Sequence, residues 1–285
     1  MTQTITPDFI ADQVASMGEV ERFPAFGPEG LTSRYYMYYR GTEQVGVPCT
    51  ADRHAMDLER VNEVAQEMAH MIGDVGDMSA RWASNRYSLM FKGSRTYEIT
   101  PGDTVRHNFG FGTGFDGRAA FVMGGLNRGI CENGLIFNAV AGMNMSLKIR
   151  HTQSLNWRVD LALSKMGEII ANADRLVGVA RRASERMVSF GEAFRAVFPL
   201  ADDASRRTRA IDDRRAEQVA QRIWNERIKL GRNASLQDVS AWEMFNGIQG
   251  VQQHKETKRP TNEHERIMRA AENSSVQRAA ELLLV

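Results

Sequence analysis

Residues 86–151 decide the fold, and they read RYSLMFKGSRTYEITPGDTVRHNFGFGTGFDGRAAFVMGGLNRGICENGLIFNAVAGMNMSLKIRH. Short apolar runs alternate here with segments that carry Gly, Asp and Asn. The runs are Tyr87–Phe91, Tyr97–Ile99, Phe109–Phe111, Ala119–Met123, Leu135–Ala139 and Leu147–Ile149. Between them, Pro101–Asp103, Phe115–Gly117 and Glu132–Gly134 have the composition of turns, because Gly and Asn tolerate the positive φ angles of tight hairpins. The pattern predicts an antiparallel β-meander.

The residues before the meander mix helical and extended patterns. Asp57–Ile72 repeats apolar residues at three- and four-residue steps, which predicts an amphipathic helix that covers one side of the sheet. A short helix is predicted at Asp8–Met17. Phe23–Gly30 contains two prolines and two glycines and is predicted to be a loop, whereas the tyrosine-rich Arg34–Arg40 favours a strand.

Beyond the meander, Gly and Pro become sparse and the apolar residues follow a helical period. Leu155–Phe198 is predicted to form a long helix or a broken pair. Further helices are predicted at 206–230, 235–253 and 262–284. We therefore expect an α+β protein with a central antiparallel β-meander sheet packed by helices, followed by a helical C-terminal half. The expected domains are residues 1–160 and a helical region, 161–285, that packs on the sheet and on neighbouring subunits.

Composition narrows the class of protein. No stretch approaches the roughly 18 apolar residues that a membrane span needs, and the N-terminus lacks a secretory pattern, so we expect a cytoplasmic protein without a membrane partner. Cys49 and Cys131 match no zinc-ligand spacing, and the six histidines form no metal-binding motif. We expect neither a metal nor another cofactor.

Charge is distributed unevenly along the chain. The whole sequence carries a formal net charge of +1. Residues 1–85 hold 6 basic and 13 acidic side chains (6 − 13 = −7), whereas residues 86–158 hold 9 basic and 4 acidic ones (9 − 4 = +5). The meander is therefore locally basic, a property that favours polyanionic partners.

The basic residues of the meander are the candidate nucleic-acid contacts. They are Lys92, Arg106, Arg118, Arg128, Lys148, Arg150, His151 and Arg158. Alternate residues of a strand point to opposite faces, so Lys148 and Arg150 should point the same way while Leu147 and Ile149 face the core. Phe109 and Phe111 could stack on bases. An ordinary charged solvent face with core aromatics is an equally good interpretation.

Two other patterns have structural explanations. Gly110–Gly114 resembles a phosphate-binding glycine loop, but it has no GK[ST] and no strand-to-helix context, so a glycine-tolerant strand or bulge is the better interpretation. Asp103 and Asp116 could share a metal as nuclease carboxylates do. Turn formation is the default explanation for both aspartates, and we find no catalytic constellation.

Four segments in order resemble a phage and plasmid family known as domain of unknown function 932. They are Ile99–Val105, Gly114–Ala120, Asn127–Leu135 and Lys148–Thr152. The resemblance covers roughly residues 86–285.

Two motifs of that family are similar to segments of this chain. Its R-V-x-C-x-N-G-L core is similar to Arg128, Cys131, Asn133, Gly134 and Leu135. Its tryptophan–asparagine–histidine motif is similar to Trp242, Asn246 and His254. Gly129 and Gly247 stand where the family has valine and alanine, so both matches are looser than the full motifs.

The plan of strands followed by helices is similar to that of phage single-strand annealing proteins of the RecT and Red-beta kind. This resemblance implies a non-enzymatic single-stranded DNA-binding and annealing protein of phage or plasmid recombination, acting as a homo-oligomeric ring or filament. The candidate cations would neutralise phosphates, and bound bases would stay open for pairing. The alternatives are an interaction protein that binds a host protein through the acidic first 85 residues, and a metal-dependent nuclease.

Overall fold

The computed structural model describes residues 5–27, 30–50, 52–83, 85–115, 119–130, 133–137, 139–152, 154–233, 235–255 and 261–285. The chain forms two compact units that interleave along the sequence, whereas the sequence analysis places a single boundary at residue 160. Unit 1 comprises residues 1–95, 108–124 and 146–171, and unit 2 comprises residues 96–107, 125–145 and 172–285. Three strands of the meander run from one unit into the other.

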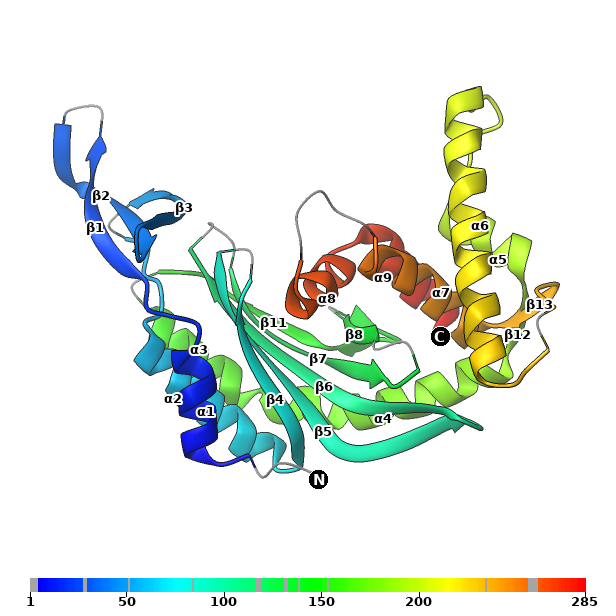
Figure 1. Cartoon of the computed structure of the whole chain (residues 1–285), viewed down its shortest axis with the longest axis horizontal. Coiled ribbons are helices and arrows are strands. Elements are labelled where there is room, and N and C mark those ends of the chain that lie inside the picture. Colours follow the sequence, from blue (N-terminus) through cyan, green and yellow to red (C-terminus); the bar gives the residue numbers. More distant parts are fainter. Residues whose placement is uncertain are drawn as a thin grey trace. The chain divides into compact units, whose positions relative to one another are not determined.

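The meander is confirmed as a six-stranded sheet (Figure 1). Its strands are β4 (Val75–Trp82), β5 (Arg86–Thr100), β6 (Asp103–Gly114), β7 (Ala120–Arg128), β8 (Asn133–Phe137) and β11 (Ser146–Ile149). The order is β11-β7-β6-β5-β4, and β8 also pairs with β7. The predicted runs Tyr87–Phe91 and Tyr97–Ile99 merge into β5, and β4 was not predicted. Pro101 and Gly102 form the expected turn between β5 and β6, with Gly102 at φ +78°.

A second, three-stranded sheet precedes the meander in unit 1. It consists of β1 (Glu21–Gly27), β2 (Gly30–Arg40) and β3 (Glu43–Thr50) in that order. The predicted loop at 23–30 is therefore wrong, because β1 pairs antiparallel with β2 through most of it. Pro24 is tolerated since β1 is an edge strand and its register shifts between Pro24 and Ala25.

The helices of unit 1 follow their predicted faces. α1 (Pro7–Ala15) packs on α2 (Leu58–Ile72) and on β4 (Figure 1). Asp57 caps α2 by accepting a hydrogen bond from the Arg60 N–H at 2.8 Å. α2 buries Val61, Val64, Ala65 and Met68, which belong to the apolar face expected from the sequence.

Residues 155–198 were predicted to form a long helix or a broken pair, and the structure breaks this helix at two places. α3 (Leu155–Ser164) lies in unit 1 and contacts β11, and α4 (Met166–Glu185) begins in unit 1 and continues in unit 2. The short strand β12 (Met187–Ser189) then precedes α5 (Phe190–Val197). Met187 and Ser189 leave the helical path because β12 pairs antiparallel with β13 (Asp238–Ser240).

The remaining helices form the rest of unit 2. They are α6 (Arg206–Lys229), α7 (Ala241–Gln253), α8 (Glu263–Ala271) and α9 (Ser274–Leu283), and the short strands β9 (Ala139–Val140) and β10 (Met143–Asn144) pair with each other. α7 contacts α6, α8 and α9 and is the most buried of them. It begins later than predicted because Ser240 and Glu243 form a capping box. No helix within the described ranges is long and apolar enough to cross a membrane.

Glycines in the middle of β6 let the sheet pack closely. A Cβ on Gly112 would lie 2.4 Å from Cζ of Phe121, so only glycine leaves room for that ring. Gly110–Gly114 is thus strand and not a phosphate loop, as the sequence analysis interpreted it.

Candidate nucleic-acid interface

Lys148 and Arg150 are exposed at the end of the edge strand β11. Both side chains are exposed, and Ile149 between them is only 4% exposed. This alternation confirms the predicted orientation for Ile149, while Leu147 is half-buried. β11 pairs with β7 through Lys148 opposite Phe121 and Ile149 opposite Ala120. The sheet thus presents two cations on a strand whose other edge is unpaired among the described strands.

α3 carries a third exposed candidate beside this strand. Arg158 is exposed, and its Nε donates to Oγ of Ser154 at 3.0 Å. Arg60 of α2 forms an ion pair with Asp160, which ties α3 to α2 within unit 1. Burial alone would lower the pKa of Arg60, but hydrogen bonds and ion pairs with Glu63 and Asp160 raise it. Arg158 is therefore held on a fixed helix.

His151 has a positioning role in this arrangement. Its Nδ1 lies 3.0 Å from the carbonyl oxygen of His54, and its Nε2 lies 3.5 Å from Oγ1 of Thr113. Both ring nitrogens therefore face protein groups of unit 1. The ring therefore anchors the segment after β11 through His54, and its predicted contact with phosphate stays a prediction.

Arg128 was predicted to contact phosphates, and the structure contradicts this prediction. Its side chain is 0% exposed and lies within unit 2. Its Nε and Nη2 each donate to a carboxylate oxygen of Asp103 at 2.7 Å, and its Nη1 pairs with Glu226. The guanidinium carbon also lies 5.8 Å from the ring centroid of Trp242. A buried arginine with two carboxylate partners is not available to phosphates.

In the same network, Asp103 is not available as a metal ligand, the role that the nuclease hypothesis gives it. Its carboxylate is 0% exposed and also accepts a hydrogen bond from Nε1 of Trp242 at 3.0 Å. Asp116, its proposed metal-binding partner, lies outside the described residues. Across the part of the chain that the structure describes, no group of three or more His, Cys, Asp or Glu side chains could hold a metal ion.

Burial also contradicts the predicted base-stacking role of Phe109 and Phe111. They are 1% and 0% exposed, so their rings belong to the core of unit 1 and present no face to a base. Two interpretations of these rings followed from the sequence: stacking on bases, or packing in the core beneath a charged face of the sheet. Burial on both sides of β6 decides between the two interpretations.

The other three candidates lie apart from β11 and α3 in the chain. Lys92 is half-buried on β5, with Nζ 3.8 Å from a carboxylate oxygen of Asp77 on β4. Arg106 is half-buried in unit 2. Arg118 lies outside the described residues. The structure thus brings Lys148, Arg150, His151 and Arg158 onto adjoining elements of unit 1.

Two residues of unit 1 escaped the sequence analysis. Trp157 of α3 is 64% exposed, although helix burial follows Leu155, Val159 and Ala162. A tryptophan out of phase with that face was a signal available in the sequence. Arg53 follows β3 and lines a pocket with Arg150. No spacing pattern links residue 53 to residue 150, so this pairing comes only from the fold.

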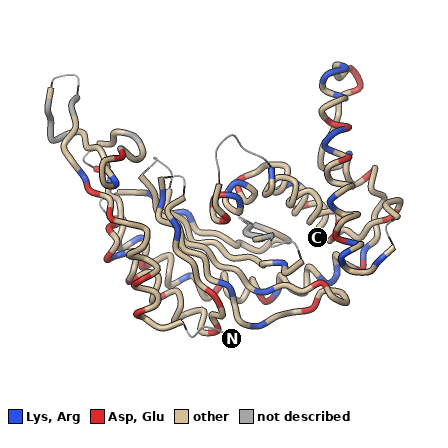
Figure 2. The backbone as a smooth tube through the Cα atoms, in the orientation of Figure 1, with Lys and Arg blue, Asp and Glu red and all other residues tan. Residues whose placement is uncertain are grey.

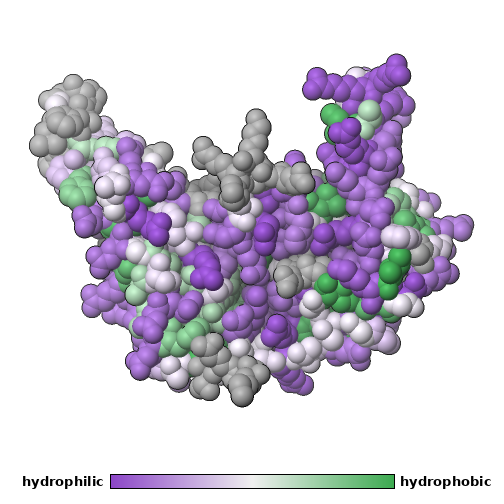
Figure 3. All heavy atoms as spheres, viewed as in Figure 1, coloured by the Kyte–Doolittle hydropathy of each residue, from purple (hydrophilic) through white to green (hydrophobic). Residues whose placement is uncertain are grey.

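Basic side chains also lie along α6 in unit 2. Lys and Arg alternate with Asp and Glu there, and they also occur on the strands (Figure 2). Over α6, the face drawn in Figure 3 is mainly hydrophilic. Arg195 and Arg215 pair with Asp212, and Arg222 pairs with Glu226. Much of the charge on α6 is thus compensated within unit 2.

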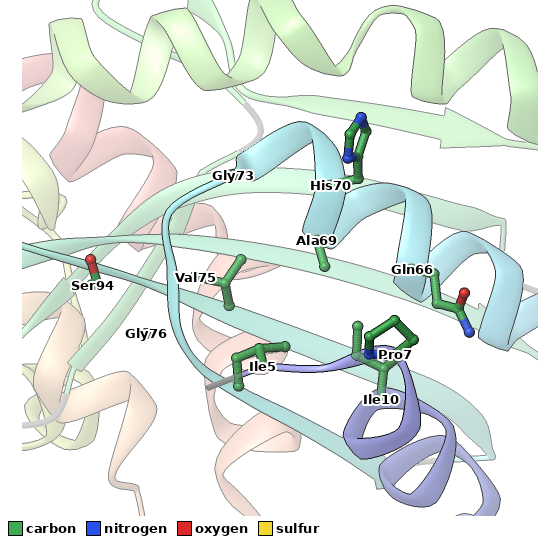
Figure 4. Close-up of a pocket in the computed structure, with 10 residues that line it drawn as sticks. All are labelled: Ile5, Pro7, Ile10, Gln66, Ala69, His70, Gly73, Val75, Gly76 and Ser94. Carbon is green, nitrogen blue, oxygen red and sulfur yellow. The ribbon is translucent and has the colours of Figure 1, made fainter. Parts of the chain in front are cut away.

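A separate pocket in unit 1 has both polar and apolar walls. It has a volume of about 690 Å³ and lies where α1, α2 and the turn before β4 meet. Ile5, Ile10 and Val75 line it, and the His70 ring points away from them (Figure 4). It lacks a cationic side chain in its lining, so it does not belong to the interface formed by β11 and α3.

Comparison with known protein families places most of the chain in a family. The family model described as Domain of unknown function (DUF932) matches residues 56–276. No curated protein and no solved structure matches the chain.

Proposed function

We propose that this chain, which belongs to the DUF932 family, binds single-stranded DNA and anneals complementary strands as a homo-oligomer without catalytic chemistry. One observation carries the proposal. Lys148 and Arg150 are both exposed at the end of an edge strand, and α3, which contacts that strand, exposes Arg158. We call these three residues, all within unit 1, the basic edge.

Exposed cations suit this function for a physical reason. A cation that binds a backbone phosphate releases a condensed counterion, and this release drives binding that does not depend on sequence. Among the residues that the structure describes, Lys148 and Arg150 have no carboxylate partner, whereas Arg128 already has two. The proposed phosphate contacts are therefore the basic edge and not the full set of meander cations.

Base contacts in this proposal come from α3. Aromatic side chains hold single strands by stacking on bases of any identity. Trp157 is adjacent to Arg158 and is 64% exposed, so its ring can take the role that buried Phe109 and Phe111 cannot. Strands bound by their phosphates and by one stacked base keep other bases open, which supports annealing.

Fluorescence anisotropy of a labelled single-stranded oligonucleotide tests the binding step. Lys148→Gln/Arg150→Gln should weaken binding by about tenfold near 0.1 M salt. It should also reduce the slope of log K against log salt by about 1.4, since each phosphate contact on a single strand contributes about 0.7. The matched control is Arg206→Gln/Arg207→Gln, which removes two exposed charges from α6.

Equal binding by wild type and the Lys148/Arg150 variant would overturn the proposed interface. Loss of DNA binding in the α6 control would indicate that α6 of unit 2 contacts the DNA. Annealing is measured separately, by energy transfer between two labelled complementary strands, with native mass spectrometry reporting the oligomer. Binding without faster annealing would reduce the proposal to single-strand binding alone.

Exposed apolar residues favour a second candidate, a chain that binds a host protein. Trp157 and Leu161 are 64% and 43% exposed and lie four residues apart on α3. A mainly apolar protein contact should depend little on salt, whereas DNA binding should weaken steeply between about 50 and 200 mM. The salt dependence therefore separates the two candidates.

A further inference from the structure

A pocket in unit 1 gathers residues from three distant segments. It is lined by Thr50 at the end of β3, by Asp52 and Arg53 after it, by Ala119 before β7, and by Arg150, His151 and Thr152 after β11. Its volume is about 470 Å³. All of these residues belong to unit 1.

The polar groups of this pocket favour an anion. Two arginines, Arg53 and Arg150, line it together with the hydroxyl-bearing Thr50 and Thr152. Asp52 is the one carboxylate of the lining, and it is exposed, so water screens its repulsion. Arginine presents a planar fork of N–H donors that matches the oxygens of a phosphate.

Arg53 supplies an independent observation. Its backbone is fixed, because its N–H donates to the Thr50 carbonyl at 3.1 Å and its carbonyl accepts from the Tyr38 hydroxyl at 3.5 Å. Its Nε and Nη2 are nevertheless buried and have no hydrogen-bond partner within the described chain. Buried charged donors without acceptors are costly, and an anion that binds there would satisfy them.

The helix that follows the pocket, α3, begins in a way that suits a nearby anion. α3 begins three residues after Thr152, its N-cap Ser154 makes no side-chain capping bond, and its first turn holds no acidic residue. The Ser154 hydroxyl instead accepts from Arg158 and lies 3.1 Å from the Thr152 hydroxyl. The positive end of this helix dipole therefore has no negative partner in its N-cap or its first turn.

We infer that this pocket binds a phosphate group, held by Arg53 and Arg150 with Thr50 and Thr152 as hydroxyl donors. The inference rests on the proposed function in that Arg150 also belongs to the basic edge. His151 fixes the segment through His54. The phosphate comes from the backbone of a bound strand or from a free or terminal phosphate.

Isothermal titration calorimetry with inorganic phosphate tests the site on the full chain. Wild type should bind one phosphate per chain, and Arg53→Gln and Thr152→Val should each weaken it at least fivefold. Arg206→Gln, which removes an exposed charge of α6 outside both the pocket and the basic edge, is the matched control and should bind phosphate like wild type. No saturable phosphate binding by wild type, together with unchanged DNA binding by Arg53→Gln, would overturn the inference while leaving the basic edge intact.

Labelled oligonucleotides with a 5′-hydroxyl or a 5′-phosphate identify the source of the phosphate. If Arg53→Gln weakens both at least fivefold, the ligand is a backbone phosphate. If it weakens only the 5′-phosphorylated strand, the ligand is a terminal phosphate. Phosphate binding by a wild-type protein that does not bind the oligonucleotides would support the pocket and reject the proposed function.

Thermal melting separates a ligand role from a structural one. Without phosphate, Arg53→Gln should melt at or above the wild-type temperature, because the variant removes a buried charge that lacks a partner. Phosphate should raise the melting temperature of wild type and not that of the variant. A large drop for the variant without phosphate would assign Arg53 a structural contact and overturn the inference.

Discussion

Arg128 and Arg150 stand at equivalent places in the sequence, one as the last residue of β7 and the other directly after β11, but their surroundings differ completely. Arg128 is 0% exposed between Asp103 and Glu226 of unit 2, whereas Arg150 is exposed in unit 1. Both matched the same pattern of a cation on a strand of a basic meander. The comparison teaches that the partners of a cation, and not its place on a strand, decide whether it stabilises the fold or is available for a ligand.

The largest effect is expected from Arg128→Met. It leaves Asp103 and Glu226 buried without their cation, which should lower the free energy of unfolding by about 3–5 kcal/mol. Arg150→Met is the control, and it should change that free energy by no more than about 0.5 kcal/mol. Urea unfolding followed by circular dichroism measures both. Equal losses would erase the distinction between the two arginines.

Glu243→Gln should have the next largest effect. Burial alone would raise the pKa of the Glu243 carboxyl, but hydrogen bonds from Arg227 and from the Ser240 backbone lower it below its ordinary value. This lowered pKa gives stability that is full above about pH 4.3, the unfolded value, and is lost as pH falls through the folded-state pKa. At pH 7 the variant should lose about 2 kcal/mol of unfolding free energy.

Urea unfolding between about pH 3 and 7 checks the sign of this effect. The gap between wild type and Glu243→Gln should narrow as pH falls below the ordinary glutamate value. A gap that widens in acid would contradict the lowered pKa. The test also extends the contrast between Arg128 and Arg150 to a third arginine, because Arg227 has a buried carboxylate partner as Arg128 has.

Trp242→Phe should have a smaller effect on the same network. The phenyl ring keeps part of the packing but loses the Nε1 hydrogen bond to Asp103, which should cost about 1 kcal/mol. Asp103 would keep both bonds from Arg128. Thermal unfolding measures the loss, and a loss as large as that of Arg128→Met would show that the tryptophan, not the arginine, holds the network.

The smallest effect on stability is expected from Trp157→Ser on α3. The exposed ring should contribute no more than about 0.5 kcal/mol to the free energy of unfolding. Oligonucleotide binding should nevertheless weaken by about 1–3 kcal/mol if the ring stacks on one base. Leu161→Ser is the matched control, because it removes an exposed apolar side chain that has no ring. Equal weakening by both variants would contradict stacking.

Local patterns predicted much of the fold. Short apolar runs bounded by turn residues marked β5, β6, β7 and β11, and helical periodicity marked α2 and α6. β1 was missed because Pro24 and the nearby glycines indicate a loop unless an edge strand tolerates them. A broken pair of helices was one of the two structures predicted for 155–198, but the strand β12 after α4 was missed because it depends on pairing with β13, about 50 residues later in the chain. Long-range pairing overrode the local signal there.

The candidate site was predictable only in part. Alternation correctly gave exposed Lys148 and Arg150 around buried Ile149. The burial of Arg128 between two carboxylates was not predictable, because these partners lie 25 and 98 residues away in sequence. The same holds for Arg53, whose neighbourhood with Arg150 arises only when β3 and β11 fold into unit 1. Local sequence reports which way a side chain points, but not which distant group meets it.

The shortness and charge of β11 limit how copies of this chain can assemble. If two copies joined edge to edge in the antiparallel register that places Lys148 opposite Lys148, the two ammonium groups would lie close to each other, and like charges directly opposite repel. A continuous intermolecular sheet in that register is therefore disfavoured. In the proposed ring or filament, subunit contacts away from this edge would leave the strand free to meet a polyanion.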